Sequence, residues 1–191
     1  MGFESLPRSL VVRAKLLSLT LALVLGAAVS ACGGDDSSSS ESAATPAPTE
    51  TATAQAANVD AIVKGITKNT KKKPAIVTPQ GDPPSRLVVK DIVKGKGRPA
   101  KPGDRLTMQY VGVSWSTGEQ FDASWDRGQP FAFQLGAQMV IPGWDEGMVG
   151  MRQGGRRLLI IPPDLGYGPQ GSGPIAPNET LVFAVDLQKL K

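Results

Sequence analysis

The chain has 191 residues, of which 40% are hydrophobic and 5% aromatic, and its formal net charge is +4 at pH 7. It contains no histidine and a single cysteine, Cys32, which excludes a Ser-His-Asp triad, a Cys-His dyad, a His/Cys zinc site and an internal disulfide. Beyond residue 31 there are 18 basic and 16 acidic side chains, an excess too small to predict nucleic-acid binding, which would need a clustered basic face.

The N-terminal 31 residues have the pattern of a secretory signal peptide. Arg8, Arg13 and Lys15 precede an apolar run from Leu16 to Val29, and small residues follow. A basic region, a short apolar region and a small-residue end are typical of such signals. The run is shorter than the roughly 20 apolar residues of a transmembrane helix, so an uncleaved anchor helix is the weaker alternative.

The residues Val29-Ser30-Ala31-Cys32 resemble a bacterial lipobox, in which the cysteine is acylated and becomes the new N-terminus. The resemblance implies at least two acyl chains on Cys32, and two chains are enough for stable anchoring. The sequence therefore predicts an exported protein that is lipid-anchored to the outer face of the bacterial cytoplasmic membrane, in the cell envelope.

Residues 32–82 are predicted to form the lipidated cysteine and a flexible linker. From Gly33 to about Asn58 the chain is rich in small and polar residues and has no aromatic residue, so we expect disorder. Residues 59–77 carry a few aliphatic side chains among lysines, which is compatible with a loosely docked segment. The basic run 71–73 fits a solvated linker, and a membrane-surface or peptide-binding patch is the alternative.

Five short segments of the C-terminal half have the properties of strands, because apolar residues in most of them alternate with polar or small ones. Such alternation predicts an antiparallel sheet with one buried face. The segments are residues 86–93, 106–111, 131–135, 157–161 and 181–189.

One segment, residues 141–148, is predicted to be helical. Pro142 suits the first helical turn and an acidic pair suits the positive end of the helix dipole. Trp144 and Met148 share a face, and Gly150 can end the helix. One short helix against one sheet indicates an α+β domain.

Five motifs then follow one another in a familiar order, and together they resemble the FKBP family of peptidyl-prolyl cis/trans isomerases from about Leu87 to Leu190. The resemblance implies a curved antiparallel sheet wrapped around one short helix, and it places the isomerase domain at residues 83–191. The motifs are Phe121-Asp122-Ala123-Ser124, Pro130-Phe131-Ala132-Phe133, Val140-Ile141-Pro142-Gly143-Trp144-Asp145-Glu146-Gly147, Pro162-Pro163-Asp164-Leu165-Gly166-Tyr167-Gly168 and Leu181-Val182-Phe183.

The same resemblance implies a pocket for the prolyl ring. Trp144 would form its floor, and the main-chain N–H of Ile141 and the hydroxyl of Tyr167 would donate hydrogen bonds to substrate carbonyls. No metal ion or cofactor is implied. The expected catalytic residues are Tyr110, Asp122, Trp144, Tyr167 and Phe183, and the expected substrate-binding residues are Phe121, Phe131, Val140, Ile141 and Ile175.

Packing offers a competing explanation for several of these residues. Phe133 alternates as a core residue would, Trp144 could fill a helix face alone, and Asp122 could simply form a turn. Tyr167 lies between two glycines, where packing explains it poorly. Trp125 is expected at the rim of the pocket, and Met139 stands where the family often has glutamate.

These features predict an enzyme that accelerates rotation of X–Pro bonds in proline-containing, exported polypeptides. It would act as a monomer attached to the membrane through its lipid, would not bind nucleic acid, and could accept macrolide inhibitors of the kind that bind the family. A proline-peptide-binding chaperone module of the same fold, with little turnover, is the alternative. A lipoprotein adhesin or solute receptor is supported by nothing beyond the anchor.

Overall fold

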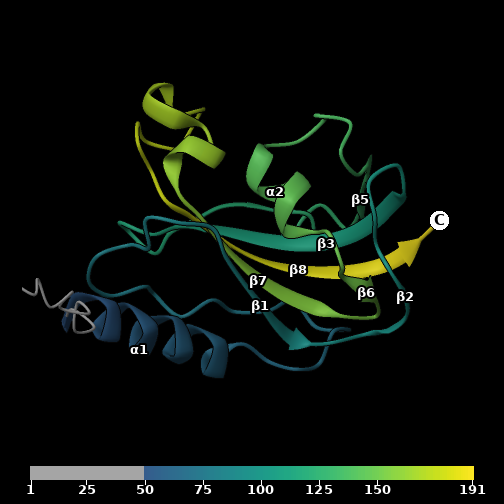
Figure 1. The fold of residues 1–191 in the computed structure, drawn as a ribbon, viewed down its shortest axis with the longest axis horizontal. Coiled ribbons are helices and arrows are strands. Elements are labelled where there is room, and N and C mark those ends of the chain that lie inside the picture. The colour runs from purple at the N-terminus through teal and green to yellow at the C-terminus, as the bar shows by residue number, and fades with distance from the viewer. Residues whose placement is uncertain (1–49) are drawn as a thin grey trace, which may run out of the picture. The chain divides into compact units, whose positions relative to one another are not determined.

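Six antiparallel strands form the main sheet of the computed structural model, which describes residues 50–191 (Figure 1). The order is β1-β7-β8-β3-β4, and β5 pairs with β3 beside β4; β2 and β6 form a separate two-stranded sheet. The signal peptide and the lipobox lie outside the described residues. The strands are β1 (Val88–Val93), β2 (Lys96–Pro99), β3 (Arg105–Ser114), β4 (Gln120–Ala123), β5 (Phe131–Gln134), β6 (Arg152–Gln153), β7 (Arg156–Ile161) and β8 (Leu181–Leu190).

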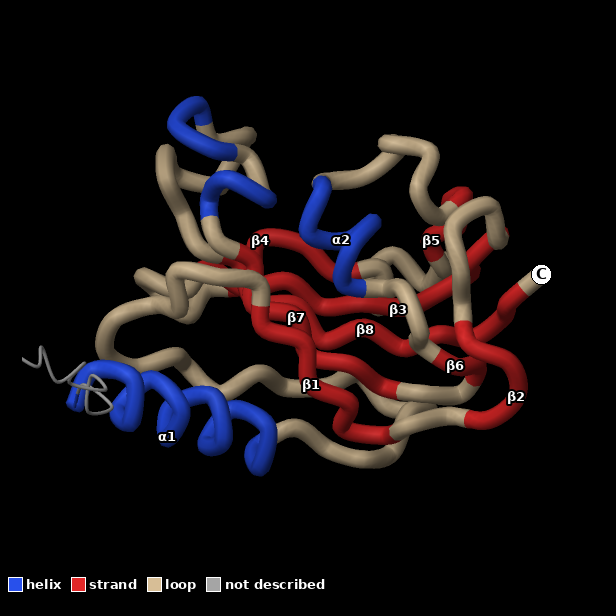
Figure 2. The backbone as a smooth tube through the Cα atoms, viewed as in Figure 1, coloured by secondary structure: helices blue, strands red, loops and turns tan. Residues whose placement is uncertain are grey.

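Two α-helices, α1 (Glu50–Gly65) and α2 (Pro142–Gly147), lie on opposite faces of the main sheet (Figure 2). Two short 3₁₀ helices, η1 (Pro163–Leu165) and η2 (Gly168–Gln170), follow β7. The predicted curved antiparallel sheet with one short helix is confirmed by β1, β3, β5, β7, β8 and α2. Alternation did not predict β2, β4 or β6, because β2 and β6 have no large apolar side chain and β4 has only Phe121.

The short helix α2 packs closely on the inner face of the sheet because it carries two glycines four residues apart. A Cβ on Gly143 would lie 2.4 Å from a methyl carbon of Ile161, and one on Gly147 would lie 2.7 Å from Leu159. Between them Trp144 points into the inner core, where it meets residues of β3 and β8. This close approach brings the indole ring against the sheet.

The outer face of the sheet is also buried, so the predicted sheet with one solvent face is wrong. Every residue of β7 is buried, and the outward-pointing residues of β8 lie in a second apolar cluster. Helix α1 contributes Val59 and Ile62 to that cluster, and Ile66, directly after the helix, joins them; each is at most 5% exposed. The strands of the middle of the sheet therefore have apolar residues on both faces.

The flexible linker predicted for residues 32–82 is corrected from Glu50 onward, since helix α1 begins there and includes Asn58; residues 32–49 lie outside the described residues. The disorder expected up to about Asn58 rests on small and polar residues, yet alanine is the best helix former. The docked segment expected over residues 59–77 is present, with Val59, Ile62 and Ile66 buried. The aliphatic residues of its second half, Val59, Ile62 and Val63, pack against the sheet. The local sequence does not show that the outer face of the sheet is available for this helix to pack on.

The segment 66–82, which we name the strap, runs from α1 to the domain and is fixed at several points. Trp115 Nε1 donates to the Gly81 carbonyl at 2.9 Å, and Asn58 Nδ2 donates to the Gln80 carbonyl at 2.6 Å. Lys73 forms an ion pair with Asp126 at 2.6 Å. The predicted domain boundary at residue 83 therefore does not hold, because the packed unit extends through the strap to α1.

Two adjacent buried arginines at the start of β7 connect the sheet to its two covering layers. Arg156 pairs with Asp186 of β8 and donates to the carbonyls of Thr67 (2.6 Å) and Lys72 (2.8 Å) in the strap. Arg157 pairs with Asp91 of β1 (2.7 Å) and donates to two carbonyls at the end of α2. Each guanidinium is thus satisfied, as a buried charge must be.

Candidate active site

An aromatic cavity of about 180 Å³ opens between α2, the sheet and the loop that follows β7. Its walls come from seven structural elements, so only the folded domain assembles it. The lining residues are Tyr110 (β3), Phe121 and Asp122 (β4), Phe131 (β5), Met139, Val140 and Ile141 (the loop before α2), Trp144 (α2), Tyr167 (between η1 and η2) and Phe183 (β8).

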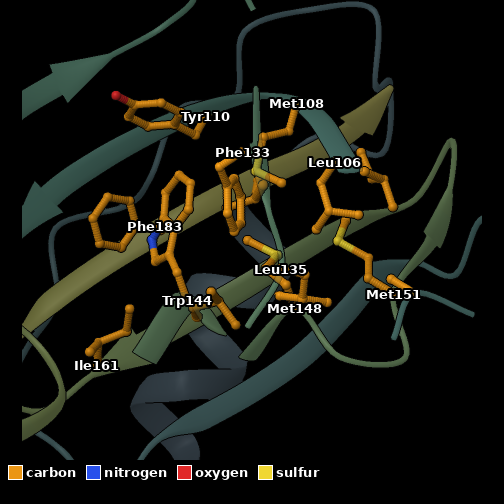
Figure 3. Close-up of a cluster of buried hydrophobic side chains, with 14 of the residues drawn as sticks. Leu106, Met108, Tyr110, Phe133, Leu135, Trp144, Met148, Met151, Ile161 and Phe183 are labelled. Atoms are coloured by element: carbon orange, nitrogen blue, oxygen red, sulfur yellow. The ribbon is translucent and has the colours of Figure 1, made fainter. Parts of the chain in front are cut away.

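The rings of this cavity meet edge to face around Trp144. The Trp144 ring centroid lies 5.1 Å from that of Tyr110 and 5.2 Å from that of Phe183, with interplanar angles of 85° and 84°. Phe121 meets Phe183 in the same way at 5.5 Å. Figure 3 shows the indole rising from α2 beside Phe183 and Phe133. Such contacts hold the rings rigidly, which fixes the shape of the cavity.

Gly112 of β3 makes room for two of these rings. It pairs with Asp122 of β4 on one side and with Phe183 of β8 on the other. A Cβ at this position would lie 2.6 Å from the Phe121 ring and 2.7 Å from the Phe183 ring. Only glycine lets both rings close over the strand, a requirement that strand alternation in the sequence did not reveal.

One wall of the cavity carries a linked set of polar groups. The Tyr110 hydroxyl donates to one oxygen of the Asp122 carboxylate, and Arg127 pairs with the other oxygen. Arg127 Nη2 also donates to the Tyr110 hydroxyl oxygen at 2.8 Å. Burial, reinforced by the bond to Asp122, raises the pKa of Tyr110 to about 12. The phenol is therefore a permanent donor at neutral pH, and together with Arg127 it holds the Asp122 carboxylate in place.

The loop before α2 is held in place by Asp145. Its carboxylate accepts hydrogen bonds from the main-chain N–H groups of Gly136 (2.8 Å) and Gln138 (3.0 Å). Gln138 has a φ of 55°, in the left-handed region that non-glycine residues rarely adopt. The loop leads to Ile141, whose N–H donates to no acceptor among the described residues. Asp145 thus orients a loop that leaves a main-chain donor at the cavity.

Two further polar groups lie at this cavity. Tyr167 is 40% exposed and sits between η1 and η2, where Gly168 takes a φ of 60° and turns the chain. Trp144 Nε1 is buried and has no hydrogen-bond partner among the described residues. A phenolic hydroxyl at the mouth and an unpaired N–H in the floor are both donors that a bound carbonyl could accept from.

Nine of the ten residues expected at the site lie together at the cavity, and Ile175 does not. Ile175 is on the loop after η2, but it is 7% exposed and packs into the inner core, because its backbone turns back onto Ser172. Trp125, expected at the rim, instead lines a separate hollow with Thr70 and Asp186. Phe133 is a core residue, as the packing alternative held.

Met139, Gly112 and Asp145 were not among the expected site residues. Met139 lines the cavity and is 65% exposed, and the motif order could have indicated it, since it directly precedes Val140. Nothing in the local sequence distinguishes the other two. Among residues 50–191, no group of three or more His, Cys, Asp or Glu residues is placed to hold a metal ion.

Comparison with known proteins identifies relatives of this chain. The family model for FKBP-type peptidyl-prolyl cis-trans isomerases matches residues 96–188. An FK506-binding protein of Streptomyces anulatus is 55% identical over 118 residues, which is 61% of this chain and 95% of that protein. This chain belongs to the FKBP-type peptidyl-prolyl cis-trans isomerase family. The predicted enzyme class is therefore confirmed.

Two other similar proteins cover comparable shares of this FKBP. A probable FK506-binding protein of Corynebacterium glutamicum is 51% identical over 116 residues, covering 61% of this chain and 97% of that protein. The crystal structure of AtFKBP13 has a TM-score of 0.53 and 36% identity, and it covers 57% of this chain and 96% of that chain. Helix α1 and the strap of this FKBP lie before the region that the family model matches.

Proposed function

We propose that this chain accelerates rotation of X–Pro bonds in exported polypeptides by stabilising the twisted amide in the aromatic cavity. The observation that carries the proposal is the cavity itself: five aromatic rings and two aliphatic residues enclose a space of small-ligand size, with fixed hydrogen-bond donors at its edge. The aromatic residues are Tyr110, Phe121, Phe131, Trp144 and Phe183, the aliphatic ones are Val140 and Ile141, and Tyr167 stands at the mouth.

Catalysis of amide rotation requires an apolar site with placed hydrogen-bond donors and does not require a nucleophile. The planar amide is stabilised by resonance, so rotation crosses a barrier of about 18–20 kcal/mol, and uncatalysed X–Pro exchange takes tens to hundreds of seconds. In the twisted transition state the amide loses resonance and much of its dipole. An apolar cavity disfavours the polar planar form relative to the twisted one, and donors aimed at the rotated carbonyl bind the transition state better than the ground state.

Each part of the site has a role in this mechanism. The prolyl ring would rest on Trp144, and the Ile141 N–H and the Tyr167 hydroxyl would donate to substrate carbonyls. Asp122, held by Tyr110 and Arg127, would fix the polar wall against which the rotating carbonyl moves. The chain has no histidine, the usual side chain for proton transfer near neutral pH, and the mechanism requires none.

The proposed location is the outer face of the cytoplasmic membrane, with a lipid on Cys32. The support is the order of basic, apolar and small residues before that cysteine. Within residues 50–191 no helix is both long enough and apolar enough to cross a membrane. Replacing Cys32 with serine should release the protein from membranes after alkaline washing. Continued partition with membranes would refute lipidation and indicate that the apolar run is the anchor.

The activity is tested by a coupled proline-isomerisation assay on the whole chain carrying Cys32→Ser. We expect catalysis of cis/trans exchange in a proline tetrapeptide, and competition by a macrolide of the FK506 type, since relatives are named for binding it. Binding of proline peptides without catalysis would favour the chaperone alternative. Catalysis that a saturating macrolide does not reduce would place the active site elsewhere than the aromatic cavity.

A further inference from the structure

The basic residues of this chain are concentrated at one end of the sheet, although the net charge is small. We name this region the cationic end. It comprises the turn from β1 through β2 to the start of β3, the strand β6 and the last residues of β8. Its basic side chains are Lys94, Lys96, Arg98, Lys101, Arg105, Arg152, Lys189 and Lys191.

The charge of the cationic end exceeds that of the whole described chain. Eight basic side chains there accompany a single acidic one, Asp104. The rest of residues 50–191 carries ten basic and twelve acidic side chains. The excess of positive charge therefore lies entirely in one place, which a net charge for the whole sequence cannot reveal.

Most of these charges are exposed and have no acidic partner. Arg98 pairs with Asp104 at 2.6 Å, and none of the other seven basic side chains forms an ion pair within residues 50–191. Of the eight basic side chains, Arg152 is half-buried and the others are exposed. Strands β3 and β8 are joined here, because Arg105 and Lys191 exchange backbone hydrogen bonds of 3.1 and 3.0 Å. Seven positive charges without an acidic partner thus lie at the same end of the sheet.

The cationic end also contains a wide, shallow hollow of about 760 Å³, lined in part by Lys94, Lys96 and Arg98. Gly154 and Gln188 belong both to this hollow and to a neighbouring one that Lys71 lines. The basic surface therefore continues onto the strap. It shares no lining residue with the aromatic cavity.

We propose that the cationic end docks the domain onto a bilayer that contains anionic phospholipid. Basic side chains near such a surface attract it additively, and a basic patch supplements an acyl chain as a second membrane signal. The identity of the partner rests on the lipid anchor of the proposed function, because that anchor would keep one polyanion, the bilayer, permanently within reach. A tethered surface binds at a high effective concentration, so weak contacts are sufficient.

The length of chain between the anchor and the domain permits this contact. Residues 33–49 separate Cys32 from α1, and 17 residues span at most about 60 Å when extended. Helix α1 itself is about 24 Å long. The attachment at the N-terminus of α1 therefore does not prevent the cationic end from reaching the bilayer. Because the two hollows share no residue, docking would leave the aromatic cavity open to polypeptides.

The test is binding of the whole chain carrying Cys32→Ser to lipid vesicles. Vesicles of phosphatidylcholine with phosphatidylglycerol are compared with vesicles of phosphatidylcholine alone. Binding to the neutral vesicles measures any insertion of the apolar N-terminal run. We expect stronger binding to the anionic vesicles, and a decrease with added salt. Changing Lys94, Lys96 and Lys189 to glutamine should weaken that binding at least about tenfold.

A second triple variant, with glutamine at Lys64, Arg86 and Lys90, removes the same charge from exposed positions outside the cationic end. It should keep most of the binding, and both variants should keep full activity on a soluble tetrapeptide. Equal losses in the two variants, no preference for anionic vesicles, or tighter binding to duplex DNA than to vesicles would each overturn the proposal. Vesicle binding without isomerase activity would refute the proposed function and leave the docking surface standing.

Discussion

Helix α1 should contribute to the stability of the active site even though it lies on the far side of the sheet. Ile62 is 2% exposed and packs in the second apolar cluster, on the outer face of the sheet, with side chains of β7 and β8. Those strands also carry, on their inner face, residues that surround Trp144. We therefore expect Ile62→Ala to destabilise the whole domain and not only the helix.

The magnitude follows from the atoms removed. Ile→Ala removes three buried carbons at about 0.8 kcal/mol each, or about 2.4 kcal/mol of transfer free energy. The cavity left behind adds to this, and the opposing gain in helix propensity is a few tenths of a kcal/mol. The free energy of unfolding should fall by about 2–4 kcal/mol. For a domain of about 5–15 kcal/mol this is a large fraction.

Two probes of one denaturant titration separate the possibilities. Tryptophan fluorescence reports the domain, because Trp115, Trp125 and Trp144 all lie outside α1, while far-UV circular dichroism also reports α1. Both transitions should move to lower denaturant together, with the slope unchanged. Val77→Ala, at a 48% exposed site in the strap, is the matched control and should change stability by less than about 0.5 kcal/mol.

A contrary result would be a fluorescence transition of Ile62→Ala that stays within about 0.5 kcal/mol of the parent while the dichroism signal loses helix. That result would mean that α1 unfolds independently and that the outer face is stable without it. It would also restore the boundary at residue 83.

Other changes act directly at the cavity. Trp144→Ala removes a buried ring, so stability should fall by about 3–5 kcal/mol together with activity. Tyr167→Phe removes only an exposed hydroxyl, so kcat/KM should fall while the unfolding midpoint stays; equal destabilisation by both changes would make Tyr167 a core residue. Gly112→Ala should lower kcat/KM, because the new methyl displaces two cavity rings; an unaffected kcat/KM would show that the rings adapt. Between about pH 6 and 8 kcat/KM should be flat, since no unperturbed side chain here titrates in that window, and a bell-shaped profile would indicate proton transfer. The raised pKa of Tyr110 stabilises the fold fully below pH 10, and this contribution should be lost as the pH rises toward 12.

The main strands and helix α2 could be predicted because the local sequence of each indicates its secondary structure and its buried side. The alternation of Leu106, Met108 and Tyr110, and the proline and tryptophan at the start of α2, are local signals of a strand and a helix. The motif order added the cavity residues, which no local pattern brings together. Their catalytic roles stay predictions until the substitutions are made.

Helix α1 and the strap could not be predicted, since whether they are ordered depends on contacts with residues distant in sequence. An Ala-rich segment such as α1 is helical or disordered according to whether a surface is present to receive Val59 and Ile62. The same applies to Ile175, which lies on a loop between two of the motifs and packs into the core. Gly112 and Asp145 matter through what they touch, and contacts between distant segments are not visible in a single sequence.

The two adjacent arginines of β7, Arg156 and Arg157, favour one register of this strand against its neighbours. Adjacent strand residues point to opposite faces, so Arg156 meets Asp186 and the strap while Arg157 meets Asp91 and the end of α2. A slip of β7 by one residue would exchange the two faces. Each guanidinium would then be buried away from its carboxylate, a cost of several kcal/mol per ion. In a strand whose remaining four residues, Leu158, Leu159, Ile160 and Ile161, are aliphatic and nearly interchangeable, the two charges select a single register.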